Sequence, residues 1–167
     1  IVFYNSTVDA STIMDYCTVE YGGLGGFNSN INCNAASPTI QNCTIRHSDG
    51  YGIYCNDQSA PTLTNNTISN NDVYPISLFC GLLDSNVTGN TGSGNGTNAI
   101  QVRDGGITSS RTWIPQDFYF NVTGGIHVYS DATLTINPGC LVKFNAGGAL
   151  HIGYYSGAIL NAVGTSG

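Results

Sequence analysis

Charged residues are scarce in this chain. Asp, Glu, Lys and Arg together make up 8% of its 167 residues, against roughly 25% in an average soluble domain. Only four are Lys or Arg, against ten Asp and Glu, and the net charge of −6 excludes the basic surface that binding to nucleic acid or anionic lipid requires. No run of 18 apolar residues occurs, so the sequence predicts no membrane-spanning helix.

Residues that favour helices are also few. The chain has one Met and four Lys and Arg, and its apolar residues do not recur at helical spacing. The abundant residues are small or neutral polar: 22 Gly, 19 Asn, 17 Thr and 15 Ser. β-Branched residues alternate with them in runs such as Thr39-Ile40 and Thr67-Ile68, which predicts very short strands separated by Asn and Gly corners.

The short runs recur along the chain at a regular spacing. Ser37 to Ile45 aligns without a gap with Ala60 to Ile68 at an offset of 23. Two columns of apolar residues emerge, one through Ile31, Ile53, Ile76 and Ile100 and the other through Val19, Ile45, Ile68 and Val87. The offset drifts between 19 and 26 while the apolar positions stay aligned, which is typical of stacked coils with elastic corners.

This pattern predicts an all-β fold, a parallel β-helix (β-solenoid) of about 22-26 residues per coil. At about 3.3 Å per residue, one coil holds three short strands, and parallel hydrogen bonds stack the next coil about 4.8 Å above it. Because one coil cannot bury its apolar side alone, the core depends on the stacking of coils.

The whole chain, 1–167, is expected to be one domain with three parts. Residues 1–88 are Asn-rich coils, residues 89–113 a long loop or a loose coil, and residues 114–167 coils of another style. In that last part Gly-Ile-His-Val repeats as Ala-Leu-His-Ile 24 residues later. Too few coils follow the loop for this part to stand alone.

Two groups of motifs carry a resemblance to a known family. Asn-Cys-Thr-Ile at 42–45 and Gly-Tyr-Gly-Ile at 50–53 resemble the repeats of right-handed parallel β-helix proteins of the pectate-lyase-like superfamily. Ala132 to Gly139, followed by Val142-Lys143-Phe144, resembles the lead-in coils of large surface-exposed bacterial and archaeal members. The resemblance implies right-handed coils, which parallel crossovers favour in general, and an extracellular or cell-surface location.

The order of the two styles points to unfinished ends. In the resembled proteins the lead-in coils come first, whereas here they close the chain. The chain opens without a charged start or cleavage motif, as expected of a processed product or a piece of a longer protein. Since unpaired strand edges invite pairing, we expect assembly contacts in a tandem array or a head-to-tail filament, at Ile1, Val2, Phe3, Leu160 and Gly167. Removed or absent flanking residues would explain the same order.

The six cysteines allow three interpretations. Cys17 and Cys43 share a column, as do Cys33 and Cys55. Stacked coils place Cα atoms about 4.8 Å apart, but parallel side chains keep the Cβ atoms near that distance rather than the preferred value of about 3.8 Å. Buried free thiols are therefore favoured over intrachain disulfides. A metal site is the weakest interpretation, because no Cys-x-x-Cys pair occurs.

No catalytic residue, metal or cofactor is predicted. A β-helix polysaccharide lyase needs clustered acids for Ca²⁺ and a basic residue on one face. One neighbourhood offers such residues, and it consists of Glu20, Arg46, His47, Asp49, Asp57 and Asp72. In the repeat alignment Glu20 stacks on Arg46, which predicts an exposed ion pair, and Asp49 stacks on Asp72 as a pair of corner-forming aspartates.

Glycan chemistry is the second theme of the sequence. Asn-x-Ser/Thr sequons, which suggest N-glycans in an extracellular protein and most of all at the loop residue Asn95, occur at Asn5, Asn42, Asn65, Asn86, Asn95 and Asn121. Asn42 and Asn65 align at an offset of 23, so a stacked Asn ladder explains them equally. Candidates for stacking against sugars are Tyr51, Tyr54, Tyr154 and Tyr155. The pairs Tyr21/His47 and His127/His151 are expected to stack on the outer surface.

Together these features predict a non-catalytic, extracellular structural β-helix protein whose partner is itself, as a building block of a surface array or filament. A glycan-binding or adhesive module for polysaccharide is the alternative. A polysaccharide lyase, epimerase or hydrolase is a third.

Overall fold

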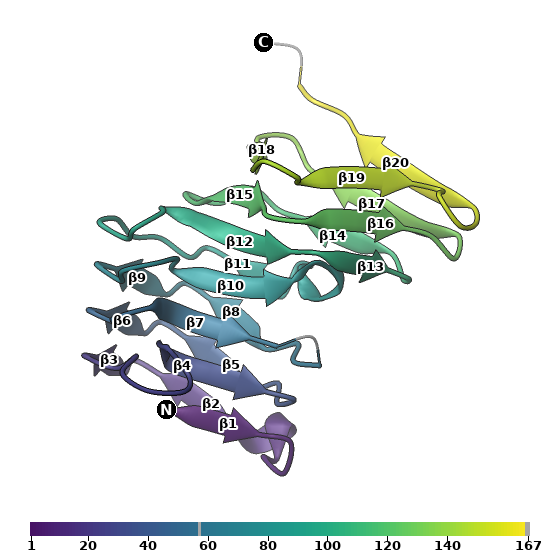
Figure 1. Cartoon of the computed structure of the whole chain (residues 1–167). Coiled ribbons are helices and arrows are strands. Elements are labelled where there is room, and N and C mark those ends of the chain that lie inside the picture. The colour runs from purple at the N-terminus through teal and green to yellow at the C-terminus, as the bar shows by residue number, and fades with distance from the viewer. Residues whose placement is uncertain (57, 166–167) are drawn as a thin grey trace.

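The chain winds into stacked coils of short strands (Figure 1). The computed structural model describes residues 1–56 and 58–165, so the predicted assembly residue Gly167 and the acidic residue Asp57 lie outside the described residues. Neighbouring strands of a sheet come from successive coils and are parallel. The predicted all-β parallel β-solenoid is therefore confirmed. Helical structure in the described part is limited to the 3-10 turns η1 (Asp9–Ser11) and η2 (Cys80–Leu82), and no helix there could span a membrane.

Five sheets, which we name A to E, form the walls of the solenoid. Sheet A runs from the first described coil to the last through β1 (Val2–Tyr4), β4 (Ser29–Asn34), β7 (Tyr51–Cys55), β10 (Ile76–Phe79), β12 (Ala99–Arg103), β15 (Tyr119–Val122) and β18 (Val142–Phe144). Sheets B and C wall the N-terminal coils, and sheets D and E wall the C-terminal coils.

Each of these four sheets is short. Sheet B contains β2 (Ile13–Asp15), β5 (Thr39–Gln41), β8 (Thr62–Thr64) and β11 (Val87–Thr88). Sheet C contains β3 (Thr18–Glu20), β6 (Thr44–Arg46) and β9 (Thr67–Ser69). Sheet D contains β13 (Gly105–Ile107), β16 (Gly125–Val128) and β19 (Ala149–Ile152). Sheet E contains β14 (Arg111–Trp113), β17 (Ala132–Ile136) and β20 (Ala158–Ala162).

The first predicted apolar column is confirmed. Register pairs join Ile31 to Ile53, Ile53 to Ile76, and Ile76 to Ile100, and all four side chains are fully buried. Since a shift of one residue would turn each of these side chains to the outer face, the column fixes the register of sheet A.

The second predicted column is wrong at one residue. Val19, Ile45 and Ile68 stack in sheet C as expected, but Val87 pairs with Leu63 in sheet B. The 3-10 turn η2 occupies residues between β10 and β11. Val87 therefore follows its actual partner Leu63 by 24 residues, instead of following Ile68 by 19. A gap-free alignment of apolar residues cannot detect such a turn.

Two residues form each corner between sheets B and C. The first has a positive φ, 52° at Asn42 and 55° at Asn65, a left-handed conformation that Asn tolerates better than most residues. The second points into the core, and both Cys43 and Asn66 are buried there. This geometry explains why Asn is so frequent in the N-terminal coils.

The cross-section changes in the middle of the solenoid. The sequence predicted either a long loop or a loose coil for residues 89–113. The structure shows that they contain the strands β12, β13 and β14. Among the described residues, β10 and β12 of sheet A form the backbone ladder between the last coil walled by sheets B and C and the first coil walled by sheets D and E. Side chains supplement it: Gln116 Nε2 donates to Val87 O at 2.9 Å, and Asp84 Oδ1 accepts from Thr112 N at 3.0 Å.

Candidate functional site

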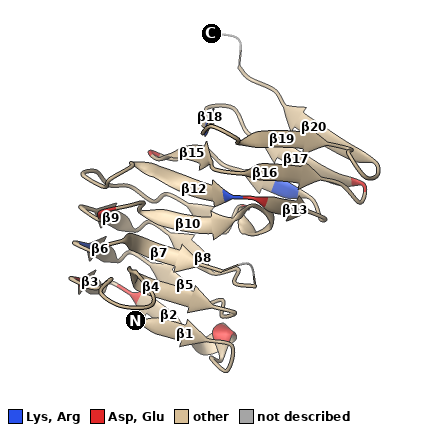
Figure 2. Cartoon of the chain, in the orientation of Figure 1, with Lys and Arg blue, Asp and Glu red and all other residues tan. Residues whose placement is uncertain are grey.

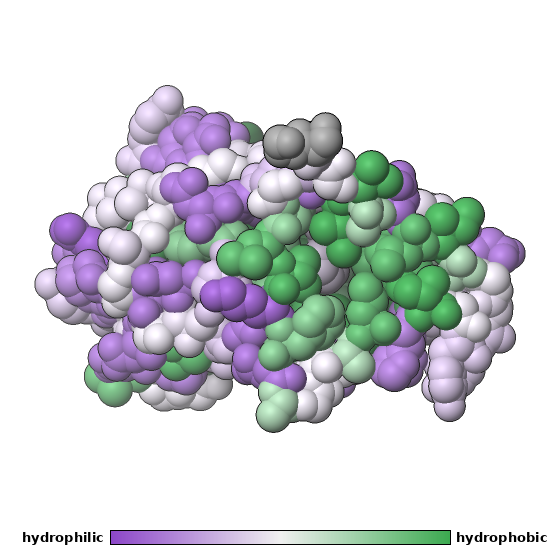
Figure 3. All heavy atoms as spheres, turned by 90° about the horizontal axis from the view of Figure 1, so that it is seen from above, coloured by the Kyte–Doolittle hydropathy of each residue, from purple (hydrophilic) through white to green (hydrophobic). Residues whose placement is uncertain are grey.

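The core is uncovered at the last described coil. In sheet A, Val122 is fully buried, whereas Phe144, its partner one coil further on, is 49% exposed. In sheet E the exposed fraction rises from 0% at Leu134 to 42% at its partner Leu160. Figure 3 looks onto this end and shows hydrophobic residues gathered across its middle. We call this surface the C-terminal face, and its exposed apolar residues are Leu141, Phe144, Ile152, Leu160 and Val163.

The first coil also offers core positions at its outer edge. Phe3, Met14 and Val19 pack on the core while remaining partly exposed, and Ile1 is 55% exposed. Within the described residues no strand lies on the far side of β1, β2 or β3. Of the predicted assembly residues, Ile1, Val2 and Phe3 lie at this edge and Leu160 lies on the C-terminal face, so the structure groups them at opposite ends of the stack.

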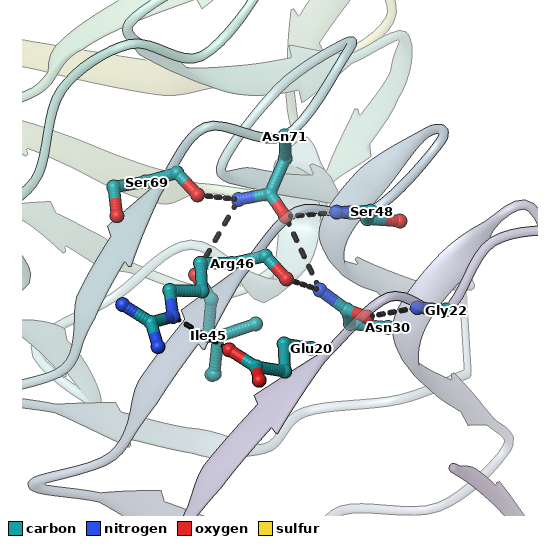
Figure 4. Close-up of polar contacts among 8 residues, drawn as sticks. All are labelled: Glu20, Gly22, Asn30, Ile45, Arg46, Ser48, Ser69 and Asn71. Atoms are coloured by element: carbon teal, nitrogen blue, oxygen red, sulfur yellow. Dashed lines mark hydrogen bonds and ion pairs between the residues drawn. The ribbon is translucent and has the colours of Figure 1, made fainter.

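Buried amides bind the N-terminal coils to one another at the corner after sheet C (Figure 4). Asn71 Oδ1 accepts from Ser48 N at 3.0 Å and from Asn30 Nδ2 at 3.2 Å. Asn30 Oδ1 accepts from Gly22 N at 2.7 Å, and Asn30 Nδ2 also donates to Arg46 O at 2.8 Å. Because these amides satisfy backbone groups that the corner removes from the strand ladders, their role is structural.

The charged neighbourhood weighed as a catalytic candidate forms an exposed pair and a ring stack. Arg46 Nε lies 2.7 Å from Glu20 Oε2, and both side chains are at least one third exposed. Next to them Tyr21 stacks on His47, with ring centroids 5.2 Å apart and an interplanar angle of 11°. Figure 2 shows that charged residues are few and scattered along the solenoid. The carboxylates of its described members, Glu20, Asp49 and Asp72, are all exposed.

Asp49 and Asp72, the remaining described members of that neighbourhood, are exposed corner residues. The backbone N–H of Asp49 donates to Gly22 O at 3.0 Å, and that of Asp72 donates to Ser48 O at 2.9 Å. Each therefore takes the same place one coil apart, as the repeat alignment predicts.

A groove of about 450 Å³ opens beside the outer face of sheet A. It is lined by uncharged residues, which are Gly26, Phe27, Asn28, Asn32, Asn34, Tyr51, Tyr54 and Asn56. Aromatic faces and amides together supply the apolar contact and the hydrogen bonds that a neutral polar ligand such as a sugar requires.

Neighbouring side chains hold the two groove tyrosines in place. The rings of Tyr51 and Tyr54 have centroids 5.3 Å apart, and Tyr51 stacks on Tyr74 at 6.4 Å. The guanidinium of Arg103 lies 4.7 Å from the centroid of the Tyr54 ring and donates to its hydroxyl at 2.9 Å. Burial raises the pKa of Tyr51, so its hydroxyl stays neutral over the physiological range. The groove therefore presents a preformed aromatic wall.

The other two predicted tyrosines belong to a different surface. Tyr154 and Tyr155 lie between β19 and β20, with ring centroids 4.6 Å apart. They pack against the His127/His151 stack, whose centroids are 4.5 Å apart and whose planes differ by 9°. The predicted stacking of the histidines is confirmed, but the four tyrosines do not form one platform.

The structure removes two of the six sequons as glycan acceptors, including the one favoured most. Asn95 is 7% exposed, and its Nδ2 donates to Ile68 O at 3.0 Å. Asn121 is 4% exposed, and its Nδ2 donates to the Tyr74 hydroxyl at 2.8 Å. A glycan on either nitrogen has no room in the folded chain. Asn95 is an inward corner residue rather than the loop residue that the sequence suggested.

The other four sequons are more accessible. Asn5 and Asn65 are exposed, while Asn42 and Asn86 are partly exposed. Asn42 Nδ2 donates to Asp15 Oδ1 at 2.8 Å, and this hydrogen bond is the main cause that lowers the pKa of Asp15. Asn86 Nδ2 donates to Pro61 O at 2.6 Å. Asn5 and Asn65 are thus the acceptors whose modification leaves these contacts intact.

All six cysteines are free thiols in the structure. Cys33 and Cys55 are register partners and fully buried, as the column predicts. Burial raises the pKa of Cys80 to about 12. Among the described residues no cluster of His, Cys, Asp or Glu could hold a metal ion.

Sequence reasoning missed most of the groove. Phe27 and the amides of Asn32, Asn34 and Asn56 line it but were not singled out. Asn32 and Asn34 flank the buried Cys33 in one strand, so alternation already placed them outside. The sequence does not show the path of the preceding loop, which places Phe27 in the same groove as Tyr51.

Comparison with known proteins assigns the family. No curated protein and no solved structure matches the chain. The family model described as "Right handed beta helix region" matches residues 1–114, about two thirds of the chain, and the match ends just after β14. Together with the parallel coils described above, this match shows that the chain belongs to the right-handed β-helix family.

Proposed function

We propose that the protein is a non-catalytic, extracellular structural β-helix that stacks end to end with copies of itself. The observation that carries the proposal is the C-terminal face, where core columns that are fully buried in the interior coils become 37–49% exposed at Ile152, Leu160 and Phe144. Contiguous apolar surface of this kind marks interaction sites. Within residues 58–165 no strand pairs with the outer edges of β18, β19 and β20, and such edges offer backbone donors and acceptors to a partner strand.

The neutral outer walls support the structural and extracellular parts of the proposal. The charged residues most suggestive of catalysis form an exposed pair, Glu20 and Arg46, which is a common surface feature. The resemblance of the last coils to surface-exposed β-helix proteins supports the location. Antibody labelling of intact cells of the source organism tests it, and a signal that appears only after the cells are made permeable contradicts it.

Sedimentation velocity of the 167-residue chain over a range of concentrations tests the stacking. We expect an open series of species that grows with concentration, because head-to-tail contacts do not close. Phe144→Lys and Leu160→Lys each place a charge on the C-terminal face and should reduce the chain to a monomer. Thr67→Lys places the same charge on an exposed position of sheet C and should leave the series unchanged.

Two outcomes contradict the proposal. A monomer at every concentration shows that the C-terminal face does not recruit a copy. A single dimer that does not grow shows that two C-terminal faces cover each other instead of stacking head to tail.

The groove beside sheet A favours a second candidate function, glycan binding. Its aromatic wall and amides suit a neutral polysaccharide. Titration calorimetry with neutral polysaccharides should detect binding that Tyr51→Ala and Tyr54→Ala weaken at least about tenfold, the loss of one stacked ring. Tyr155→Ala, at the other aromatic surface, is the matched control. Equal loss in all three variants contradicts a site in the groove.

A further inference from the structure

We propose that Cys17 and Cys43 are a redox-sensitive clamp, in which a disulfide joins the first two described coils when a low-molecular-weight disulfide such as oxidised glutathione is present. This inference is independent of end-to-end stacking and of glycan binding, and it uses only contacts between these two coils. It follows from the residues that come after the positive-φ residue at the end of each sheet B strand. We call them the corner column, and they are Cys17, Cys43, Asn66 and Asn90.

Asparagine amides tie the later members of the corner column together. Asn66 Oδ1 accepts from the backbone N–H of Cys43 at 3.0 Å, and Asn90 Oδ1 accepts from that of Asn66 at 3.2 Å. The Nδ2 groups of the same two amides donate to Ile40 O at 2.9 Å and to Leu63 O at 2.8 Å. Each of these junctions is therefore held by a side chain of the later coil as well as by its strands.

The junction between the first two described coils has two sulfur atoms instead. Its corner column carries Cys43 where the later coils carry asparagine, and sulfur is a weak acceptor compared with an amide oxygen. The backbone contributes a hydrogen bond from Thr44 N to Cys17 O at 2.8 Å. A disulfide at this position would link the two coils as the amides link the coils that follow.

The corners place the two thiols one above the other. In both coils the residue before the cysteine has a φ of 52°, so the two corners turn alike. Cys17 Sγ donates to Asp15 O at 3.3 Å, and Cys43 Sγ donates to Gln41 O at 3.1 Å. Since Asp15 and Gln41 are register partners, the two thiols point the same way from adjacent coils. Burial raises the pKa of Cys43, and the Cys17 thiol contributes to the rise, as expected of sulfur atoms in contact.

A second stacked pair shows why the corner matters. Cys33 and Cys55 are register partners in β4 and β7 and are fully buried. Regular parallel strands keep their Cβ atoms near the strand spacing of about 4.8 Å, whereas a disulfide needs roughly 3.8 Å. Cys17 and Cys43 lie at corners outside the strands, so a small shift of the corner can bring their Cβ atoms together without displacing a sheet. Cys17 is also exposed in the folded chain, where an oxidant reaches it.

The reaction is a thiol–disulfide exchange in two steps. The Cys17 thiolate attacks a sulfur of oxidised glutathione, forms a mixed disulfide and releases one glutathione thiolate. The Cys43 thiolate then attacks the Cys17 sulfur and releases the second. The two cysteine protons pass through solvent to the two glutathione molecules, so the chain loses two electrons and oxidised glutathione gains them. Because the pKa of Cys43 is raised, the second step should accelerate as pH rises from about 7 to 9.

Incubation of the folded 167-residue chain with oxidised glutathione tests the clamp. The remaining free thiols are alkylated during unfolding, and mass spectrometry of a pepsin digest identifies the linked peptides. We expect a Cys17–Cys43 link as the main product, with Cys33 and Cys55 recovered as alkylated thiols. Cys17→Ser should abolish the link. The matched control Cys140→Ser, which removes another incompletely buried thiol, should retain it.

Hydrogen exchange measures what the link does to the two coils. The amides that join β2 to β5 and β3 to β6 should exchange at least about tenfold more slowly in the linked chain, because the disulfide opposes separation of the coils. Reduction with dithiothreitol should restore the original rate. Cys17→Ser incubated with oxidised glutathione should show no change.

Three results overturn the proposal. The first is a Cys43 thiol that stays free, whether Cys17 is free or bound to glutathione. The second is preferential linkage of Cys33 to Cys55, or of Cys17 residues from two chains. The third is a Cys17–Cys43 link that leaves hydrogen exchange unchanged, because such a link does not clamp the coils.

Discussion

Interior coils and the last described coil continue the same residue columns, but interior positions are covered from both sides and those of the last described coil from one side. Leu63 lies between Ile40 and Val87 in its column and is fully buried. Leu160 lies on Leu134, has no strand beyond it among the described residues, and is 42% exposed. The difference teaches that burial in a solenoid belongs to the stack and not to the coil, because each coil covers only one side of its neighbour.

The largest expected effect is a difference in core truncation. Leu63→Ala removes a side chain enclosed from both sides and should cost about 3 kcal/mol of unfolding free energy, whereas Leu160→Ala should cost about 1 kcal/mol in the dissociated chain. Urea unfolding at dilution measures both. Equal costs would show that the last coil is as well packed as the interior, and the comparison would fail.

A smaller difference is expected for amides. Asn66 Oδ1 accepts from Cys43 N at 3.0 Å, and its Nδ2 donates to Ile40 O at 2.9 Å. Asn66→Ala leaves these buried backbone groups unpaired and should cost about 2 kcal/mol. Asn161→Ala, on the exposed surface of the last coil, should change stability by less than about 0.5 kcal/mol. The same urea experiment checks both, and a neutral Asn66→Ala contradicts a structural role for the corner amides.

Thiol reactivity extends the comparison to the first coil. Cys17 is exposed there, while Cys80 in an interior coil is buried and its pKa is raised to about 12. Because the thiolate is the reactive form, iodoacetamide at about pH 8 should label Cys17 within minutes and leave Cys80 unmodified until the chain unfolds. Peptide mass mapping over time measures the rates. Labelling of both thiols at similar rates would mean that the interior coils open readily.

The smallest expected effect concerns pH at the first coil. The Asn42 amide lowers the pKa of Asp15 in the folded chain, so this contact stabilises the fold above the unfolded-state pKa of about 3.9 and is lost as pH falls through the lower folded value. Hydrogen exchange of β2 amides should accelerate over that acidic window. Asn42→Ala should weaken this pH dependence, because it removes the largest of the contacts that lower the pKa of Asp15, whereas Asn5→Ala should leave it intact. If Asn42→Ala does not alter the pH profile of hydrogen exchange, the hydrogen bond between Asn42 and Asp15 is not its cause.

The fold was largely predictable because apolar residues recur at the spacing of the coils. Ile31, Ile53, Ile76 and Ile100 recur at offsets that only stacked coils satisfy. Val87 was misplaced because Leu82, which belongs to the 3-10 turn η2, was aligned with Leu63, whereas the partner of Leu63 is Val87 itself.

The candidate surfaces were less predictable, since they depend on where polar residues point. Asn95 sits between glycines in the sequence and looks like a loop residue, yet it is buried beside Asn71, with an amide contact of 2.9 Å. The feature that decides this is the positive φ of 71° at Gly94, which turns the following side chain inward. Adjacent pairs such as Asn65-Asn66 carry the same signal, a left-handed corner followed by an inward amide.

The replacement of sheets B and C by sheets D and E in the middle of the solenoid has a mechanical consequence. When tension is applied along the stacking axis, the hydrogen bonds between coils are stretched in series, so the junction with the fewest of them yields first. Between residues 75–98 and 99–118 that junction depends, for its described backbone ladder, on the β10–β12 pair alone. A single chain held at its two ends would therefore extend in two steps under force, parting at its middle before either half unravels.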